Sequence, residues 1–404
     1  MTGLAELRGN PNALACHYRR FAVSERLLLS GHSHQAWPDV AFDGVAESYD
    51  DAARYADEKW ERAFAKADEV RRGFARLLGD PAAEIALGAS THDLMVRFLS
   101  ALDLRRRPRI VTTDGEFHSL RRQLQRLDGT CAEVEWIASE PTATLAERLA
   151  TAVDERTAAV LLSAVMFETA AVVGDLDLLA ASCRRAGAEL VVDVYHALGP
   201  VPMPIRELGL EDAWIVGGGY KYLQLGEGNC FLRLPAQAAS MRPLVTGWFA
   251  EFDQREAPPG DEVAYGAGPS RFAGSTYDPT SNYRAARVFA FFAEMGLDAG
   301  FLAEVARHQV GLLADRFDAL GLDPTLVDRD RSLAPERRGG FLALRTPRAV
   351  ALGRLLAQRG VLSDSRGGYL RLGPAPYLSD RQLEAAVIAL GEAAAELAAG
   401  PRAS

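Results

Sequence analysis

A lysine between two tyrosines is the residue of this sequence with the clearest chemical potential. Lys221 lies in the stretch VGGGYKYLQLGEGN (216–229), behind three glycines that permit close backbone approach. A buried lysine has a lowered pKa, and its neutral amine condenses with an aldehyde to form a Schiff base. The alternative is a lysine at a strand end whose stem packs on apolar surface while its amine reaches water.

A carboxylate 28 residues upstream favours the chemical interpretation. Asp193 closes the apolar part of LVVDVYHALG (190–199), where its charge needs a partner, and His196 follows three residues later. In enzymes that use pyridoxal 5'-phosphate (PLP), a carboxylate keeps the pyridine nitrogen protonated while a lysine holds the aldehyde. Asp193 and Lys221 at the ends of successive strands would supply this pair. The alternative for Asp193 is a cap on the helix that follows the strand.

These side chains require a sheet whose strands end at a common edge. Short apolar runs alternate with stretches of helical spacing, which predicts a parallel sheet covered by helices. The strands are expected at 85–88, 109–113, 132–137, 158–165, 189–194 and 213–218. The helices are expected at 41–78 (one or two), 93–102, 120–127, 145–153 and 175–187.

The 404 residues exceed one ordinary core and fit a large and a small domain. After residue 284 the sequence predicts a long helix over 285–320, strands at 339–345 and 369–373, and a last helix opened by the capping box of Ser379 and Gln382. We expect an N-terminal arm (1–40) that joins the small domain and the substrate site. A large α/β domain (41–284) and a smaller C-terminal α/β domain (285–404) follow.

Bulk properties exclude several classes of protein. The net charge of −9 and the pI near 5.4 argue against nucleic-acid and membrane-surface partners, and the basic run 104–109 is interpreted as a solvated helix end. Four scattered cysteines indicate neither a zinc knuckle nor a disulfide framework. Without a signal peptide or an apolar run of about 18 residues, we expect a cytoplasmic protein.

Two of the quoted motifs carry a family resemblance. DVYHALG together with GGGYKYLQLGEGN resembles kynureninase, a PLP enzyme of fold type I (the aspartate aminotransferase fold) related to the class V aminotransferases. Tyr220 stands where class V aminotransferases and cysteine desulfurases typically have histidine. The resemblance implies a large domain with a mainly parallel seven-stranded sheet, a smaller C-terminal α/β domain, and PLP bound on Lys221 with Asp193 and His196 among its contacts.

The same resemblance assigns further cofactor contacts. Thr91 and His92 in GASTHDLM would hold the phosphate at a helix N-terminus, which binds anions. Phe117 in DGEFHSL would lie against the pyridine ring, although Leu120 replaces an aspartate of the family. Tyr220 would reach the phosphate and transfer protons.

Two phosphate contacts are expected to come from a second subunit. Trp248 in TGWFAEF matches a family tryptophan, and Thr276 in RFAGSTYDP falls where kynureninases have asparagine and class V relatives have threonine. In these families the neighbouring subunit supplies both residues. The resemblance therefore implies a homodimer with shared active sites.

The expected substrate contacts lie near both ends of the chain. Arg371 in GGYLRLGPAPYLSD matches the arginine that clamps the α-carboxylate of the substrate, the alternative being a strand-edge arginine facing water. His32, Ser33 and His34 replace the family residues that would meet the far end of the substrate. This histidine pair either hydrogen-bonds a different acyl or acidic group or caps the helix after Pro38. A metal is not expected there, because no third ligand is near.

The resemblance implies hydrolytic Cβ–Cγ bond cleavage that releases L-alanine from an amino acid, with Lys221, Tyr220 and Asp193 as the catalytic residues. Three alternatives remain: another PLP lyase acting by C–S cleavage or β-elimination, a class V aminotransferase acting on a different amino acid, and a non-catalytic regulator with a PLP fold. The complete set of cofactor residues argues against the regulator. No cysteine follows Cys230, which disfavours a persulfide-forming desulfurase.

Overall fold

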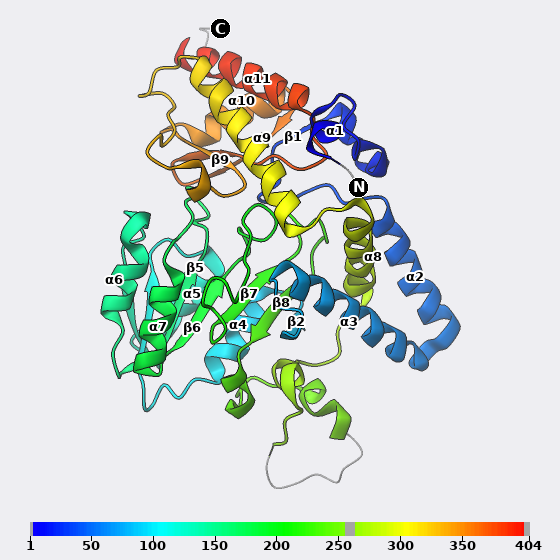
Figure 1. Ribbon diagram of the computed structural model, residues 1–404, viewed down its shortest axis with the longest axis vertical. Helices are drawn as coiled ribbons and strands as arrows, with labels where there is room; N and C mark the ends of the chain where they lie inside the picture. Colours follow the sequence, from blue (N-terminus) through cyan, green and yellow to red (C-terminus); the bar gives the residue numbers. More distant parts are fainter. Residues whose placement is uncertain (1–2, 255–262, 400–404) are drawn as a thin grey trace.

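The computed structural model describes residues 3–254 and 263–399 and has a mixed seven-stranded sheet at its centre (Figure 1). The strand order is β2-β8-β7-β6-β5-β3-β4, and all neighbours from β7 to β4 are parallel. β8 runs antiparallel to both β2 and β7. The strands are β2 (Glu84–Gly88), β3 (Arg109–Thr113), β4 (Glu133–Ile137), β5 (Thr157–Ser163), β6 (Glu189–Asp193), β7 (Trp214–Gly218) and β8 (Cys230–Leu234).

The prediction of a mainly parallel sheet covered by helices is confirmed. β5 is buried along its whole length, as its continuous apolar run indicates. β8 is the one strand of this sheet that the apolar runs above do not include. Its segment CFLRL follows a glycine-rich loop and contains Arg233, whose guanidinium forms an ion pair with Asp80 at 2.9 Å.

Helices pack on the sheet and on one another. α2, α3 and α8 form a group on one side, where α3 contacts β2 (Figure 1). The helices of this part of the chain are α2 (Val40–Tyr55), α3 (Lys59–Leu77), α4 (Thr91–Ser100), α5 (His118–Leu127), α6 (Leu145–Ala152), α7 (Leu176–Ala186) and α8 (Thr280–Met295). The expected boundary after residue 284 lies inside α8.

The expected single helix over 285–320 is wrong, because the chain forms two helices there. α8 ends at Met295, and Gly296 after it has a left-handed φ of 73°, a conformation that glycine adopts without strain. α9 (Ala299–Ala319) then begins behind Asp298, whose side chain accepts a hydrogen bond from Phe301 N at 2.9 Å. A C-terminal glycine and an N-terminal cap two positions apart, Gly296 and Asp298, therefore interrupt one apolar pattern.

The C-terminal part of the chain forms a second group of elements beyond the sheet (Figure 1). A three-stranded antiparallel sheet in the order β11-β12-β9 packs with α9 and α10. Its elements are β9 (Leu342–Arg345), α10 (Ala349–Gln358), β11 (Asp364–Arg366), β12 (Tyr369–Leu372) and α11 (Asp380–Ala399). The capping box that opens α11 is confirmed: Ser379 N donates to Gln382 Oε1 at 3.0 Å, and Gln382 N donates to Ser379 Oγ.

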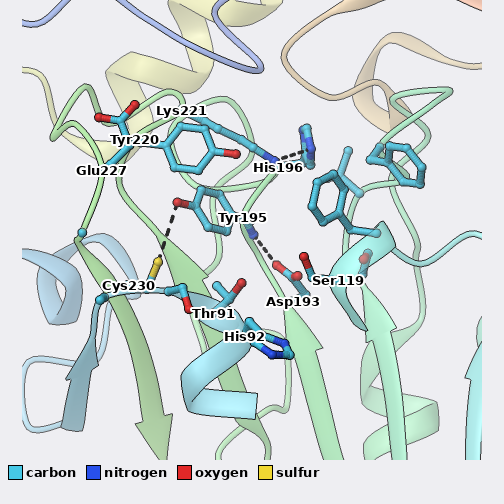
Figure 2. Close-up of a pocket in the computed structure, with 17 residues that line it drawn as sticks. Thr91, His92, Ser119, Asp193, Tyr195, His196, Tyr220, Lys221, Glu227 and Cys230 are labelled. Carbon is cyan, nitrogen blue, oxygen red and sulfur yellow. Dashed lines mark hydrogen bonds between the residues drawn. The ribbon is translucent and has the colours of Figure 1, made fainter. Parts of the chain in front are cut away.

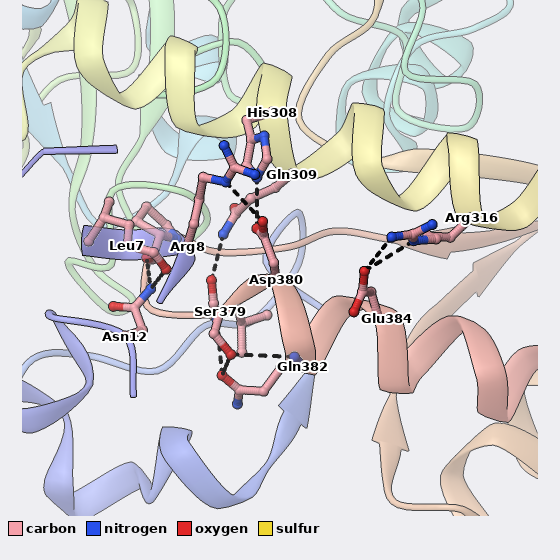
Figure 3. A network of polar contacts seen from close by, with 12 residues as sticks. Leu7, Arg8, Asn12, His308, Gln309, Arg316, Ser379, Asp380, Gln382 and Glu384 are labelled. Carbon is pink, nitrogen blue, oxygen red and sulfur yellow. Dashed lines mark hydrogen bonds and ion pairs between the residues drawn. The ribbon is translucent and has the colours of Figure 1, made fainter. Parts of the chain in front are cut away.

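The N-terminal segment is tied to this C-terminal group (Figure 3). Arg8 of α1 (Leu4–Arg8) forms an ion pair with Asp380 at 2.9 Å, and Asn12 donates to the Pro376 carbonyl. β1 (Leu27–Leu28) pairs in parallel with β10 (Val361–Leu362), and the bridge from Ser30 to Gly373 continues this contact. The chain that follows, including His32, is thereby held against β12.

Across the described residues, every helix falls short of the length or apolarity that a transmembrane span requires. Within the same ranges, no three His, Cys, Asp or Glu side chains gather as metal ligands would.

Candidate active site

A cavity of about 240 Å³ opens at the carboxyl edge of the central sheet (Figure 2). The register sets Ser163 opposite Asp193, so the ends of β5 and β6 meet, and the chain leaving β7 brings Lys221 to the same edge. Ligands of open α/β sheets bind at this edge because the loops there can converge without blocking the sheet.

Lys221 is buried in this cavity with only 5% of its surface exposed. Its Nζ lies 2.6 Å from Nε2 of His196 and 4.6 Å from the centroid of the Tyr195 ring. Burial lowers the pKa of Lys221 to about 7; the charge of Asp193 opposes this shift, and that of Arg371 adds to it. A substantial neutral fraction near pH 7 makes this amine a nucleophile and a base.

Lys221 is also distinguished from the other lysines of the chain. The sequence has three, and Lys59 and Lys66 both belong to α3. Lys66 pairs with Glu47 at 3.1 Å. Lys221 is therefore the one lysine that could hold an aldehyde in this cavity.

Asp193 is the last residue of β6 and also lines the cavity. One of its oxygens accepts a hydrogen bond from Tyr195 N at 2.8 Å. Burial raises the pKa of Asp193, while the Tyr195 amide and the nearby Lys221 lower it. A partly desolvated carboxylate of this kind would be stabilised by a protonated ring nitrogen.

The opposite end of the cavity is built by the N-terminus of α4. Ser90 caps this helix by accepting from Asp93 N at 3.1 Å, and Ser90, Thr91 and His92 all line the cavity. The helix begins at Thr91 and not at residue 93 as expected, because Ser90 takes the cap position. The backbone N–H groups and the helix dipole at this end suit a phosphate. Lys221 is the only lysine or arginine among the lining residues described.

Aromatic rings form the remaining walls. Phe117 precedes α5 as its N-cap residue and packs edge-on against Phe167, with ring centroids 5.6 Å apart. Tyr220 stacks on His34 at 5.3 Å with an interplanar angle of 23°. Burial raises the pKa of Tyr220 to about 12, so its hydroxyl keeps its proton at neutral pH. Nδ1 of His34 lies 3.4 Å from Glu227, another lining residue at the mouth.

Several residues predicted from the sequence lie outside the lining of this cavity. The Trp248 indole N–H donates to Thr276 Oγ1 at 3.2 Å, and 47% of Trp248 is exposed. Ser33 donates its backbone N–H to the Ser30 carbonyl and does not line the cavity. His32 and Arg371 are buried beside it and contact Asp364.

The sequence prediction missed Glu116, which is 1% exposed beneath the cavity wall. One carboxylate oxygen accepts from Thr113 Oγ1 at 2.7 Å and from Ser163 N at 3.1 Å, and the other accepts from Ser163 Oγ at 2.7 Å. Burial raises the pKa of Glu116 to about 7 against these hydrogen bonds. The only signal in the sequence is a carboxylate directly before Phe117, which does not show that it points inward.

Tyr195, Ser163, Glu227 and Cys230 also line the cavity and were missed as site residues. Tyr195 lies over the end of β7, where a Cβ on Gly218 would collide with its hydroxyl. Its hydroxyl lies 3.8 Å from Cys230 Sγ. The glycine preceding the Gly-Tyr-Lys segment therefore makes room for an aromatic ring beside Lys221.

Comparison with known proteins agrees with this geometry. Residues 43–224 match the model of the class-V aminotransferase family. Among solved structures, a lysine-to-alanine mutant of C-DES with glycine covalently linked to its PLP cofactor has a similar fold, with a TM-score of 0.79. The two chains are 15% identical, and the match covers 93% of this chain and 98% of that chain. The protein has the fold of the type I PLP-dependent enzymes. The sequence prediction of this fold is confirmed.

Two relatives in sequence are named for different activities, one as an aminotransferase and the other as a kynureninase. The uncharacterized aminotransferase YcbU of Bacillus subtilis (strain 168) is 25% identical over 89% of this chain and 92% of its own length. The kynureninase of Pseudomonas fluorescens is 29% identical over 61% of this chain and 58% of its own length. This fold type I chain therefore resembles both groups, and neither name transfers to it directly.

The cavity of this fold type I protein fits PLP, which confirms the predicted cofactor. A buried amine with a lowered pKa, a partly desolvated carboxylate and an anion-binding helix end share one cavity, as the aldehyde, pyridine nitrogen and phosphate of PLP require. Nδ1 of His196 is buried and has no hydrogen-bond partner among the described residues. This nitrogen is free to meet a polar atom of the cofactor.

Proposed function

We propose that this PLP-dependent protein acts on a free amino acid and cleaves its Cβ–Cγ bond hydrolytically, releasing L-alanine. The observation that carries the proposal is the pairing of the Lys221 amine, whose pKa is lowered to about 7, with the protonated hydroxyl of the adjacent Tyr220 in one cavity. The two groups can remove and deliver protons on the same ligand.

In this proposal the cofactor contacts are those expected from the sequence. Lys221 would hold the aldehyde, Asp193 the ring nitrogen, and Thr91 and His92 the phosphate, with Phe117 against the ring. Bound PLP supplies an electron sink for the negative charge that develops when a bond to the α-carbon breaks. Holding that carboxylate and that amine at the ends of neighbouring strands fixes the cofactor's orientation.

The proton transfers are assigned to this chain's own side chains. The Lys221 amine, neutral for part of the population near pH 7, removes the α-proton, and the Tyr220 hydroxyl donates a proton to the β-carbon. In the net reaction one water breaks the Cβ–Cγ bond: its hydroxyl joins the γ-carbonyl carbon to give a carboxylic acid, and its hydrogen joins Cβ. Arg371 orients the substrate through the α-carboxylate.

A persulfide-forming desulfurase is disfavoured by the cysteines that the structure describes. Cys230 is the one cysteine at the cavity, and burial raises the pKa of its thiol to about 12, so it is protonated and a poor nucleophile. Cys16 and Cys131 are exposed elsewhere, and Cys183 is buried in the core. Simple C–S lysis needs no such cysteine, and it is the second candidate because C-DES, a cystine C–S lyase, shares the fold.

A homodimer with shared sites is also proposed. Trp248 is half exposed and hydrogen-bonded to Thr276 outside the chain's own cavity, and Leu244 and Val245, a few positions earlier in the chain, are 85% and 45% exposed. Exposed apolar side chains of this kind favour burial against another chain. It would let these residues complete the phosphate site of a partner.

The test is a substrate screen of the purified holoenzyme. Kynurenine, 3-hydroxykynurenine, aspartate, cystine and thioether amino acids are each incubated with the protein, and alanine, pyruvate, ammonia and sulfide are quantified. Alanine release with an aromatic acid as co-product supports Cβ–Cγ hydrolysis. Pyruvate with ammonia and a thiol supports C–S lysis, and an amino group transferred to a keto acid supports aminotransfer. Either of the latter results overturns the proposed reaction while leaving the cofactor assignment intact.

A further inference from the structure

The guanidinium of Arg371 already has two partners within the protein. Arg371 is 3% exposed on β12, and its Nη2 forms an ion pair with Asp364 Oδ2. Its Nη1 donates to the carbonyl of Phe167, a residue that lines the cavity, at 2.5 Å. The antiparallel register pairs Asp364 of β11 directly with Arg371, so this contact is built into the sheet.

A histidine from the N-terminal segment completes the cluster. His32 is fully buried, with Nε2 3.9 Å from Asp364 Oδ2, and neither ring nitrogen has a hydrogen-bond partner among the described residues. Its ring packs on Phe341 at 4.8 Å, and a Cβ on Gly373 would collide with Nδ1. The imidazole is thus held beside the carboxylate without yet bonding to it.

The geometry limits how Arg371 can bind a substrate. A guanidinium clamps a carboxylate with two parallel N–H donors, and both Nη groups of Arg371 already have partners. Its Nε is the one guanidinium nitrogen without a partner among the described residues. Each Nη keeps a second N–H, but a two-donor clamp still has to use at least one nitrogen that already has a partner. A substrate carboxylate therefore competes with Asp364 or with the Phe167 carbonyl for Arg371.

We propose that Asp364 is an internal competitor for Arg371 that the substrate carboxylate displaces, and that His32 accepts the displaced Asp364. This inference rests on the proposed role of Arg371 in holding the α-carboxylate. It makes Asp364 a specificity-determining residue. Only a ligand that has a carboxylate of its own can take the place of the Asp364 carboxylate on Arg371.

The charges of the cluster support an exchange of partners. A buried guanidinium without a counterion is costly, so Asp364 stabilises the cluster before a ligand arrives. Arg366 lies 3.5 Å from the other oxygen, Oδ1, and keeps the carboxylate compensated before and after the exchange. Burial and the nearby Arg371 hold the pKa of His32 well below its usual range, so a neutral imidazole N–H can bond Asp364 without adding a buried charge.

The experiment measures ligand affinity and not turnover. Glycine is titrated into the holoenzyme, and binding is followed by the visible absorbance of the bound cofactor; methylamine serves as the matched ligand that lacks a carboxylate. Asp364→Asn is expected to lower the glycine Kd by about tenfold, since it removes the charged competitor, and to leave the methylamine Kd unchanged. Glu384→Gln on α11, which breaks a surface ion pair with Arg316 of α9, is the control that changes neither.

A double-mutant cycle tests the part assigned to His32. His32→Gln is expected to raise the glycine Kd several-fold in the wild-type background and to have no effect beside Asp364→Asn, because no displaced carboxylate then needs a partner. Equal effects in both backgrounds would show that His32 acts independently and would overturn its role. Asp364→Ser repeats the measurement if the amide distorts β11.

The variants also separate this inference from the proposed function. If Arg371→Lys weakens glycine binding while Asp364→Asn leaves it unchanged, Arg371 binds the carboxylate without competition, and the exchange is wrong. If Asp364→Asn weakens glycine binding, Asp364 positions Arg371, which equally overturns competition. If neither variant changes the Kd of glycine, Arg371 has no carboxylate role, and the substrate part of the proposed function fails as well.

Discussion

The amine of Lys221 lies 2.6 Å from Nε2 of His196, and both side chains are buried. Burial lowers the pKa of His196 well below its usual range, and the adjacent Lys221 lowers it further, so the imidazole is neutral and can accept a hydrogen bond from the amine. The lysine is therefore fixed in the cavity before it meets an aldehyde, since rotation away would leave two buried polar groups unpaired.

Lys221 is expected to be the only lysine that captures PLP. Borohydride reduction of the holoenzyme, followed by peptide mass mapping, should find the reduced adduct on Lys221, and Lys221→Ala should abolish it. Lys66→Ala, which removes an amine paired with Glu47 outside the cavity, is the matched control and should retain the full adduct. An adduct on Lys59 or Lys66 in the wild-type protein would contradict the assignment.

The capture reaction should also depend on pH in a particular window. The neutral amine attacks the aldehyde, and the pKa of Lys221 is lowered to about 7. Below that pKa, the rate of PLP capture by the apoenzyme should rise roughly tenfold per pH unit, and above it the rate should level off. Stopped-flow absorbance measures this rate. A rate that keeps rising toward pH 10 would indicate a lysine with an ordinary pKa.

Tyr220→Phe is expected to lower kcat by about 100-fold to 10,000-fold, because it removes the proton donor, while PLP stays bound. Tyr222→Phe provides a close control on the other side of Lys221. The Tyr222 hydroxyl is buried without a hydrogen-bond partner among the described residues, and Tyr222 does not line the cavity. The measurement is the steady-state kcat of each variant on the substrate found by the screen. Equal kcat values for Tyr220→Phe and Tyr222→Phe would rule out proton transfer by Tyr220.

The sequence could predict those parts of the site that local pattern determines. Asp193 ends one apolar strand and Lys221 follows another, and a buried charge at such a position needs a partner. The contact of Asp364 with Arg371 depends on the register of a short hairpin, and that of Glu116 with Ser163 joins residues 47 positions apart. Neither contact has a local signature, because the sequence around Glu116 and Asp364 does not indicate the direction of either side chain.

The same distinction explains the errors in the fold. The run over 285–320 keeps an apolar period through Gly296, so the period alone predicts one helix where the cap at Asp298 starts another. β8 follows two positive-φ glycines, Gly226 and Gly228, and contains a charged residue, so its five residues resemble a loop until Phe231 is seen stacked on Phe74 at 4.3 Å. Tertiary packing, and not local preference, defines that strand.

Glu116 is expected to make the stability of the protein depend on pH. Its pKa is raised to about 7 in the folded state, so between about pH 4.5 and 7 the folded protein binds more protons than the unfolded chain. The contribution of Glu116 to the free energy of unfolding should therefore fall as pH rises through this window, by up to about 3 kcal/mol. The loss should be complete above pH 7.

Urea unfolding of the wild type and of Glu116→Gln, each at pH 5 and pH 8, isolates this contribution. The variant cannot titrate at this position, so the wild type should lose stability relative to it between the two pH values. Glu384→Gln, at an exposed ion pair, should follow the wild type at both. A wild-type-to-variant difference that is constant with pH would show that Glu116 is already ionised at pH 5 or still protonated at pH 8.

Trp248 is expected to affect cofactor binding although it lies outside the cavity of its own chain. If the protein is a dimer with shared phosphate sites, Trp248→Ala should raise the Kd of PLP by about tenfold, the effect of losing one hydrogen bond to a charged group. Leu178→Ala, at a residue 43% exposed on α7, should leave it unchanged. Light scattering of the wild type should give twice the chain mass.

Mixed dimers distinguish a shared site from a distant structural effect. A dimer of one Lys221→Ala chain and one Trp248→Ala chain has one cavity in which Lys221 is paired with an intact Trp248 from the other chain. Refolding the two variants together should therefore restore tight PLP binding in part of the sample, although neither alone has it. Because a tryptophan acting within its own chain gives no such recovery, its absence in a sample proven to be dimeric would assign Trp248 to local structure.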